Sequence, residues 1–321
     1  MFSHADLLAA HAIVQHHLTP SPQIAWPLLS QRVGAEVIVK HENHLPTGAF
    51  KVRGGLVFAS TLPPDTPGLI SATRGNHGQS LAFAGARAGV PVTIVVPVGN
   101  SAEKNAAMAA HGATLIEHGE DFEAAREEAF RRAAAQGLLF VPSFAPALVR
   151  GVATYALELF TAHPDLDTVY VPIGLGSGIC GTILARDLLG LSTRIVGVQA
   201  AGADCYARSF AAGAVVAGNR AETWADGIAV RQPDPEALAI ILRGAERIVT
   251  VPDDAIAAAI RAYWTDTHNL IEGAGAAPLA ALTRERDRMR GRKVGLIASG
   301  GNIDLALFRD WVGGAAASNS P

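Results

Sequence analysis

The sequence predicts an α/β protein of two domains, each built on a twisted sheet of parallel type that is flanked by helices. Short apolar segments rich in β-branched residues alternate with longer helical segments along the 321 residues, a pattern typical of this fold class. Most of the short segments are continuous apolar runs rather than alternating ones, as expected for strands buried on both faces. Nine such segments are many for one doubly wound sheet, so we expect two sheets.

The expected elements follow one another along the chain. The segment Ser3-His4-Ala5-Asp6 resembles a capping box and predicts an N-terminal helix. Strands are expected at 36–39, 69–72, 92–96, 114–116, 138–141, 168–171, 195–198, 248–251 and 294–298. Helices are expected at 76–88, 102–111, 122–135, 148–161, 253–265 and 276–288. We expect a small domain at 68–145, a larger domain formed by 1–67 and 146–321, and a frayed tail at 313–321.

Composition and charge narrow the functional class. Charged residues make up 17% of the chain and the net charge is −3, so no basic surface for nucleic acid is expected. The longest apolar run, at 92–98, is interrupted by Pro97 and is too short to span a membrane. The first basic residue is Arg32, so a secretory signal is not expected, and Cys180 and Cys205 have neither metal-binding nor disulfide spacing. We therefore expect a cytoplasmic protein with reduced thiols.

Lys51 is the first candidate for chemistry. It follows Gly48-Ala49-Phe50 in an otherwise apolar turn, which is an unusual place for a solvated charge. A desolvated lysine has a lowered pKa, and its amine can attack an aldehyde. The alternative, a surface lysine beside a glycine-rich turn, stays open at this point.

Three loops that follow expected strands are candidate ligand sites, because open α/β sheets bind ligands beyond the carboxyl ends of their strands. The first loop, 71–78, offers the Thr73 hydroxyl, backbone N–H groups and the start of a helix. This combination suits a carboxylate. Alternatively, Thr73 or Asn76 serves only to cap the helix.

The second and third loops offer backbone donors and a hydroxyl. Four glycines lie within the eight positions from Gly174 to Gly181, where backbone N–H groups can surround a phosphate. No lysine follows to reach a second phosphate, so a single phosphate fits better than a nucleotide. A tight turn that packs a helix on a strand is the alternative. The third loop, Ser299-Gly300-Gly301-Asn302, adds one hydroxyl, although the same residues form ordinary turns.

Together these features fit one small cofactor. They comprise an imine-forming lysine, a loop for one phosphate, a loop for a carboxylate and a separate hydroxyl. Pyridoxal 5′-phosphate has an aldehyde, one phosphate and a ring nitrogen that needs a partner, and its amino-acid substrate brings the carboxylate. The sequence therefore predicts a pyridoxal-phosphate site with an amino acid as the small-molecule substrate.

The same segments resemble those of the fold-type II pyridoxal-phosphate enzymes, which share the tryptophan synthase β-like fold. The motifs at 46–54, 75–79, 174–178 and 299–302 match in order and spacing over nearly the whole chain, and the nearest branch is the threonine dehydratase and serine racemase family. The resemblance implies cofactor binding by Phe50, Lys51, Asn76, Gly174, Leu175, Gly176, Ser177, Gly178, Glu272 and Ser299. It implies that the substrate carboxylate is held by Thr73, Gly75, Asn76 and His77.

The resemblance also implies roles. Lys51 resembles the lysine that forms the imine and removes the Cα proton, Asn76 the residue that hydrogen-bonds the phenolic oxygen, and Ser299 the partner of the pyridine nitrogen. A hydroxyl, unlike a carboxylate, does not hold this nitrogen protonated, which favours β-elimination. The family thus implies an ammonia-lyase that converts a β-hydroxy amino acid to a 2-oxo acid and ammonia. It also implies a homodimer in which the small domain closes over the substrate.

Arg74 departs from the family pattern. Racemases of the family carry a serine at this position and dehydratases usually carry a small residue. Arginine stays charged and is a poor proton shuttle, so racemisation is not expected. Three roles stay open for Arg74: binding a second carboxylate of the substrate, as in 3-hydroxyaspartate; lying against an aromatic ring, as in phenylserine; or pairing with an acidic residue of the scaffold.

Other departures concern ions and rival functions. Gln199 and Cys205 stand where metal-activated relatives have acidic residues, and since an amide and a thiol are poor ligands for Mg²⁺ or Ca²⁺, no divalent metal is expected. Glu272 is kept, although Gly273 replaces the usual proline after it. The chain ends soon after Ser299, so no isoleucine-responsive regulatory domain is expected.

The alternatives to an ammonia-lyase are a racemase, a β-replacement enzyme and a cofactor-binding protein without turnover.

Overall fold

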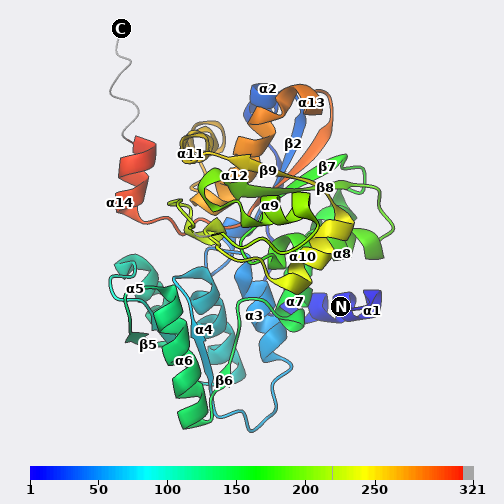
Figure 1. Cartoon of the computed structure of the whole chain (residues 1–321). Helices are drawn as coiled ribbons and strands as arrows, with labels where there is room; N and C mark the ends of the chain where they lie inside the picture. The colour runs from blue at the N-terminus through cyan, green and yellow to red at the C-terminus, as the bar shows by residue number, and fades with distance from the viewer. Residues whose placement is uncertain (219, 314–321) are drawn as a thin grey trace. The chain divides into compact units, whose positions relative to one another are not determined.

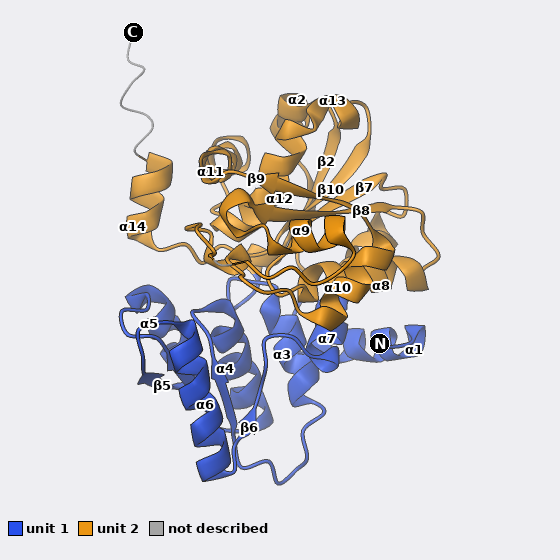
Figure 2. Cartoon of the chain, viewed as in Figure 1, with its two compact units in different colours: residues 1–19, 45–154 blue, residues 20–44, 155–321 orange. Residues whose placement is uncertain are grey.

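The computed structural model describes residues 1–218 and 220–313, so almost all of the tail expected at 313–321 lies outside the described residues. The chain divides into two compact units (Figure 2). Unit 1 comprises Met1–Thr19 and Leu45–Thr154, and unit 2 comprises Pro20–His44 and Tyr155–Pro321. Each unit is built on a sheet of its own, as the sequence predicts.

Unit 2 is built on a six-stranded sheet with the order β1-β2-β10-β7-β8-β9 (Figure 1). Its strands are β1 (Gln23–Ala25), β2 (Glu36–His41), β7 (Thr168–Pro172), β8 (Arg194–Ala200), β9 (Ala245–Val251) and β10 (Lys293–Ala298). Neighbouring strands are parallel, except that β1 runs antiparallel to β2. The carboxyl ends of the five parallel strands therefore meet at one edge of the sheet.

Helices cover both faces of this sheet. The helices of unit 2 are α2 (Pro27–Val33), the second half of α7 (Pro146–Ala162), α8 (Ser177–Leu188), α9 (Cys205–Ala212), α10 (Pro235–Gly244), α11 (Asp253–Thr267), α12 (Gly273–Arg284), α13 (Arg286–Met289) and α14 (Leu305–Leu307), with short helical turns η1 (Glu42–His44), η2 (Ala201–Ala203), η3 (Asp226–Ile228) and η4 (Phe308–Gly313). Val196 and Val198 of β8 share a core with α2, α11 and α12. Gly197 between them faces α8, where a Cβ atom would lie 3.1 Å from Cδ1 of Ile179. Because successive strand residues point to opposite faces, α8 and α12 lie on different faces.

Unit 1 is built on a four-stranded parallel sheet with the order β5-β4-β3-β6 (Figure 1). Its strands are β3 (Leu69–Ala72), β4 (Val92–Val96), β5 (Thr114–Glu117) and β6 (Leu139–Phe140). Its helices are α1 (His4–His17), α3 (Lys51–Ala59), α4 (Asn76–Ala88), α5 (Ala102–Ala110), α6 (Phe122–Gln136) and the first half of α7 (Pro146–Ala162). Leu69 and Ile94 pack with α4, α5 and α7, whereas Ile70 and Val95 pack with α6 on the other face.

The expected α/β class is confirmed, and all nine expected strands are present. The N-terminal capping box is also confirmed, since the backbone N–H groups of Asp6 and Ser3 donate to the side chains of Ser3 and Asp6 at 3.2 and 2.9 Å. The short strand β1 and the helices α2, α3, α8, α9, α10 and α14 are outside the expected set. Unit 1 contains the expected small domain, 68–145, together with 1–19, 45–67 and 146–154, because α3 packs closely on α4.

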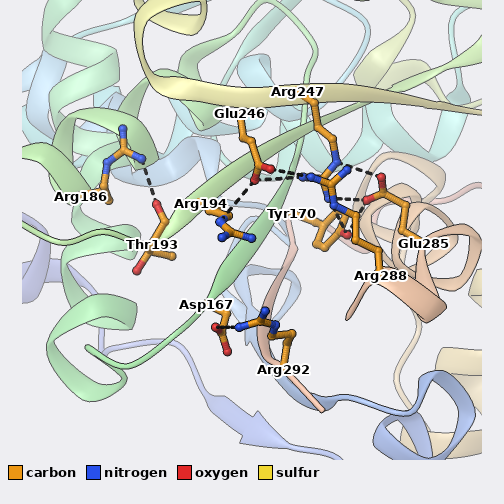
Figure 3. A network of polar contacts seen from close by, with 10 residues as sticks. All are labelled: Asp167, Tyr170, Arg186, Thr193, Arg194, Glu246, Arg247, Glu285, Arg288 and Arg292. Atoms are coloured by element: carbon orange, nitrogen blue, oxygen red, sulfur yellow. Dashed lines mark hydrogen bonds and ion pairs between the residues drawn. The ribbon is translucent and has the colours of Figure 1, made fainter. Parts of the chain in front are cut away.

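A polar network joins the strands of unit 2 toward their amino-terminal ends (Figure 3). Arg247 on β9 donates to the two carboxylate oxygens of Glu285 at 2.9 and 2.6 Å, and the Tyr170 hydroxyl on β7 donates to Glu285 at 2.6 Å. Beside it, Glu246 pairs with Arg288 at 2.7 Å. Burial and the Glu285 carboxylate raise the pKa of Tyr170, so its hydroxyl stays protonated. These charges are satisfied by one another, which indicates a structural role.

Candidate active site

Lys51 is the first residue of α3, directly after the turn that the sequence predicts around Gly48. Its side chain is half-buried, and its Nζ lies 5.3 Å from the centre of the Phe50 ring. Removal from water lowers the pKa of Lys51 to about 8, because burial disfavours the charged amine. At pH 7, roughly a tenth of the Lys51 side chains then carry the neutral, nucleophilic amine, far more than for a lysine with the ordinary pKa.

The sequence holds four lysines, and the surroundings of the other three differ from those of Lys51. Lys40 is fully buried on β2, where its Nζ donates to Glu158 at 2.5 Å and to the Ser21 carbonyl at 3.0 Å. Lys293 pairs with Asp165 at 2.8 Å in an ion pair whose carboxylate is exposed. The aliphatic part of Lys104 packs on Gly75. Lys51 is thus the lysine whose environment best fits an imine-forming amine.

Close packing of α3 on α4 brings Lys51 to the first predicted loop. The Ser80 hydroxyl of α4 donates to the Lys51 carbonyl at 2.6 Å. A Cβ atom at Gly55 would lie 2.7 Å from the Ser80 carbonyl oxygen, so only glycine permits this approach of the two helices. The Lys51 charge also acts on His77 at the start of α4. Unit 1 therefore assembles Lys51 and the predicted carboxylate loop in one place.

The start of α4 is suited to an anion. Gly75 is the N-cap, and no side chain caps the helix, so capping by Thr73 or Asn76, the alternative considered from the sequence, does not occur. The Thr73 hydroxyl instead accepts the Gly75 N–H at 3.2 Å. Uncapped N–H groups and the helix dipole both favour a negative charge at this position.

Arg74 projects from this loop into solvent. Its backbone carbonyl accepts a hydrogen bond from Asn100 Nδ2 at 3.2 Å, which fixes the main chain of the loop. Its side chain is exposed, and no acidic residue among 1–218 and 220–313 pairs with its guanidinium. Of the three roles left open by the sequence, pairing with an acidic residue of the scaffold is not seen among the described residues.

His77 is the second residue of α4 and is only 5% exposed. Burial, with a smaller effect from Lys51, lowers the pKa of His77 to about 3, so the imidazole is neutral near neutral pH. The ring atom Nε2 has no hydrogen-bond partner in the described part of the chain. A neutral ring of this kind offers a lone pair and does not supply positive charge to a carboxylate.

In unit 2, the second predicted loop leads from β7 into α8. Gly176 has a φ of 104° and is the N-cap of α8, which no side chain caps. The loop carbonyls are held by two tyrosines: the Tyr206 hydroxyl donates to Leu175 at 2.9 Å and the Tyr155 hydroxyl donates to Gly178 at 2.8 Å. With these carbonyls occupied, the uncapped N–H groups at the start of the helix suit a phosphate.

The glycines of this loop also have a packing role. A Cβ atom at Gly176 would lie 2.8 Å from Cβ of Ala237, and one at Gly174 would collide with the backbone of Gly227. The alternative considered from the sequence, a tight turn that packs a helix on a strand, therefore also explains these glycines, because glycine is needed here whether or not an anion binds. The uncapped start of α8 is the feature that favours an anion.

Ser299 and Glu272 lie together at the edge where the parallel strands end. Ser299 directly follows β10, which pairs with β7. It is 3% exposed, and its hydroxyl has no hydrogen-bond partner among the described residues. The Glu272 N–H donates to the Gly300 carbonyl at 3.0 Å, which joins the start of α12 to the third loop. Unit 2 therefore assembles the phosphate loop, Glu272 and Ser299.

Three residues that support the site were not found from the sequence. Tyr155 and Tyr206 hold carbonyls of the phosphate loop, and Gly227 in η3 touches both that loop and α12, since a Cβ atom there would lie 2.8 Å from Cβ of Ala274. Each role depends on a tertiary contact, and no pattern in the neighbouring sequence predicts it. The Asp226-Gly227 pair predicts only a turn.

The side chains of Gln199 and Cys205 hydrogen-bond one another and nearby backbone groups. Gln199 is buried, its Oε1 accepts the Ala207 N–H at 2.9 Å, and its Nε2 lies 3.9 Å from Cys205 Sγ. Burial raises the pKa of the Cys205 thiol, and Sγ donates to the Val230 carbonyl at 3.2 Å. Within the described residues, no group of three or more His, Cys, Asp or Glu side chains is arranged to hold a metal. Independence from divalent metals stays a prediction.

The residues present fit pyridoxal 5′-phosphate. Lys51 supplies a desolvated amine for the aldehyde, the start of α8 supplies N–H groups for the single phosphate, and Ser299, which is 3% exposed, supplies a hydroxyl. No helix in the described part of the chain is both long and apolar enough to cross a membrane.

Comparison with known proteins agrees with this fit. A family model described as "Pyridoxal-phosphate dependent enzyme" matches residues 14–300. The L-threonine ammonia-lyase of Geobacter sulfurreducens is 37% identical over 86% of this chain and 69% of its own length. The L-threo-3-hydroxyaspartate ammonia-lyase of Saccharomyces cerevisiae is 30% identical over 97% of each chain. The solved structure of processed threonine deaminase isoform 2 from Solanum lycopersicum has a TM-score of 0.91 at 28% identity, covering 97% of this chain and 92% of that one.

The chain therefore belongs to the family of pyridoxal-phosphate-dependent enzymes. This confirms the predicted fold type and the predicted cofactor, pyridoxal 5′-phosphate. The reaction class predicted from the sequence, that of a pyridoxal-phosphate-dependent ammonia-lyase for hydroxy amino acids, is confirmed by the relatives.

Proposed function

We propose that the preferred substrate is a β-hydroxy amino acid with a second carboxylate, of the 3-hydroxyaspartate type, which the enzyme converts to a 2-oxo dicarboxylic acid and ammonia. The observation that carries this proposal is Arg74, whose exposed guanidinium has no ion pair within the described residues and stands in the carboxylate loop. A charged guanidinium recognises a carboxylate through two parallel hydrogen bonds. The yeast relative named for 3-hydroxyaspartate supports this choice.

We propose that the residues to which the family resemblance assigns the cofactor bind pyridoxal 5′-phosphate. On the side of unit 1 these are Phe50, Lys51 and Asn76. On the side of unit 2 they are Gly174, Leu175, Gly176, Ser177, Gly178, Glu272 and Ser299. When bound, the cofactor supplies an electron sink for the pair of electrons left at Cα when its proton is removed. The Ser299 hydroxyl would be the partner of the ring nitrogen and, unlike a carboxylate, would not hold that nitrogen protonated.

The remaining roles fall to residues of unit 1. The backbone N–H groups at the start of α4 and the Thr73 hydroxyl hold the α-carboxylate, and Arg74 holds the second carboxylate. These contacts orient the Cα–H bond toward Lys51. The neutral Lys51 amine then removes the Cα proton, as a general base with a pKa near the working pH.

The chemistry balances without a further reactant. Loss of the Cα proton and of the β-hydroxyl releases one water from the substrate and leaves an enamine. After release, the enamine becomes an imine, which takes up one water and yields the 2-oxo acid and ammonia. No net oxidation or reduction occurs.

Threonine is the second candidate substrate, because the relative from Geobacter sulfurreducens is named as a threonine enzyme. Phenylserine is the third, since a guanidinium also packs against an aromatic face. Racemisation is disfavoured by the same residue, because an arginine at position 74 cannot return a proton to the opposite face of Cα.

Substrate comparison in wild type, Arg74→Ala and Arg74→Lys tests this proposal. We expect the highest kcat/KM for L-threo-3-hydroxyaspartate in the wild type. Arg74→Ala should lower that value by roughly 10- to 150-fold, the cost of losing hydrogen bonds between charged groups. The kcat/KM of Arg74→Lys should lie between those of wild type and Arg74→Ala, because lysine keeps the charge but loses the paired donors. Ammonia and 2-oxo acid are measured together.

Threonine serves as the matched control, because it lacks the second carboxylate. Its kcat/KM should change by less than about threefold in Arg74→Ala. An equal loss for both substrates would show that Arg74 supports the loop and does not select the substrate. A loss confined to phenylserine would instead favour the aromatic role.

We also propose that the enzyme is a cytoplasmic homodimer, as the family resemblance implies. Measurement of the molar mass in solution by light scattering tests the oligomeric state, and a mass of one chain of 33.3 kDa would contradict it.

A further inference from the structure

A chain of hydrogen bonds runs through unit 2 from Trp26 to Leu270. The indole N–H of Trp26 donates to Nε2 of His41 at 2.9 Å, and Nδ1 of His41 lies 3.2 Å from Oδ1 of Asn43. Nδ2 of Asn43 then donates to the Leu270 carbonyl at 3.3 Å. The chain of hydrogen bonds therefore joins the carboxyl end of β2 to the segment between α11 and α12.

The groups at its two ends fix the direction of every hydrogen bond. The indole N–H of Trp26 can only donate, so Nε2 of His41 is the unprotonated acceptor and the ring proton lies on Nδ1. Nδ1 therefore donates to Oδ1 of Asn43. The Leu270 carbonyl can only accept, which requires the same orientation of the Asn43 amide. Both ends thus lead to a single arrangement.

His41 is the central member of this chain of hydrogen bonds. Its side chain is fully buried, and burial lowers its pKa to about 4, so the ring is neutral near neutral pH. Both ring nitrogens have hydrogen-bond partners. A buried ring that uses its donor and its acceptor holds the groups on both sides of it in place.

The chain of hydrogen bonds lies beside the loop that carries Ser299. In the parallel pair of β2 and β10, the residue before Ser299 is in register with His41. Two residues after Ser299, a Cβ atom at Gly301 would lie 2.9 Å from the Leu270 carbonyl oxygen and 3.4 Å from Cβ of Asn43. The last hydrogen bond therefore packs directly against the backbone of Gly301. The backbone on both sides of Ser299 is thus held by these residues.

We propose that His41 and Asn43 are positioning residues, which hold the Ser299 hydroxyl at the place where it meets the ring nitrogen of the cofactor. They act through the backbone on either side of Ser299 and not by contact with the cofactor. The inference rests on the proposed function, which makes Ser299 the partner of that nitrogen. Because each link is a neutral hydrogen bond, the chain of hydrogen bonds fixes the hydroxyl and adds no charge of its own.

Binding of pyridoxal 5′-phosphate to the cofactor-free protein, followed by absorbance titration, tests this inference in a double-mutant cycle. Ser299→Ala removes the hydroxyl and should raise the Kd of the cofactor by roughly five- to tenfold, the effect of one hydrogen bond. Asn43→Ala removes the last link and should raise the Kd by roughly threefold or more, but by no more than Ser299→Ala does. The Kd of the double variant should equal that of Ser299→Ala within about 1.5-fold, because the position of an absent hydroxyl has no effect.

Two tryptophan substitutions form a matched pair. Trp26→Phe keeps an aromatic ring but removes the N–H, which leaves Nε2 of His41 buried without its donor. It should raise the Kd of the cofactor in the same direction as Asn43→Ala. Trp264→Phe makes the same chemical change at a tryptophan that is 51% exposed and lies outside the chain of hydrogen bonds, so the Kd should be unchanged.

A wild-type Kd in Asn43→Ala would overturn the proposal. Losses that multiply in the double variant would also overturn it, because they would show that Asn43 supports unit 2 in general and does not act through Ser299. If Asn43→Ala does not fold, Asn43→Ser takes its place, since its shorter side chain also loses the link to Leu270. Failure of the proposed function would appear differently, as a Ser299→Ala variant that binds the cofactor like wild type, and that result would contradict the inference as well.

Discussion

Replacement of Lys51 by alanine should lower ammonia release by more than about 10⁴-fold, because the substitution removes both the covalent attachment of the cofactor and the base at Cα. The visible absorbance band of the lysine-bound cofactor should disappear in the same variant. The fold should be retained, since the Lys51 side chain is only half-buried at the first position of α3. The measurements are a coupled assay for ammonia and an absorbance spectrum.

Lys293→Ala is the matched control for this experiment. Lys293 also carries an amine, but it pairs with Asp165 at 2.8 Å on the surface of unit 2, and exposed ion pairs contribute little. Activity and spectrum should stay within about twofold of wild type in this variant. Normal turnover by Lys51→Ala would contradict the role assigned to Lys51.

Replacement of Glu158 by alanine should destabilise the protein by about 3–5 kcal/mol, the largest effect on stability that we expect from a single substitution. Glu158 on α7 accepts a hydrogen bond from Lys40, whose side chain is fully buried on β2. Without the carboxylate, the positive charge of Lys40 stays buried in the core and loses a hydrogen-bonded partner of opposite charge. The free energy of unfolding is measured by urea titration with tryptophan fluorescence.

The double variant Lys40→Met, Glu158→Leu is the control. A buried ion pair replaced as a whole by apolar residues of similar volume is often neutral or stabilising. We therefore expect the double variant to recover most of the stability that Glu158→Ala loses. A double variant as unstable as the single one would show that packing around α7 matters more than the unpaired charge.

The sequence predicts the strands well because their signal is local. The segment 92–96, for example, is apolar except for Thr93 and is followed by Pro97. The helix at 76–88 lies between two glycines, so its expected bounds agree with those of α4. Two of the helices that were not expected, α3 and α8, are glycine-rich. α3 contains Gly54 and Gly55, and α8 contains Gly178 and Gly181. Glycine disfavours a helix locally, and these helices form because glycine permits close packing.

The residues of the candidate site also divide into those that the local sequence predicts and those that it does not. Lys51, the glycine-rich loop and Ser299 were predictable because each stands beside the end of an expected strand or in a motif. The two tyrosines that hold the phosphate loop were not, because Tyr155 and Tyr206 lie within helices and reach the loop only in the folded chain. The buried pair of Lys40 and Glu158 was not predictable either, since the two residues are 118 positions apart.

The central claim, that Lys51 carries the cofactor, can be tested directly by reducing the cofactor-loaded enzyme with borohydride and mapping the modified peptide by mass spectrometry. Reduction fixes the cofactor on the nitrogen that holds it, and the chain offers only four lysines, Lys40, Lys51, Lys104 and Lys293. We predict the added mass on the tryptic peptide 41–53, left uncut at Lys51 because the modified residue resists trypsin. An added mass on any of the other three lysines, or on none, would contradict the claim.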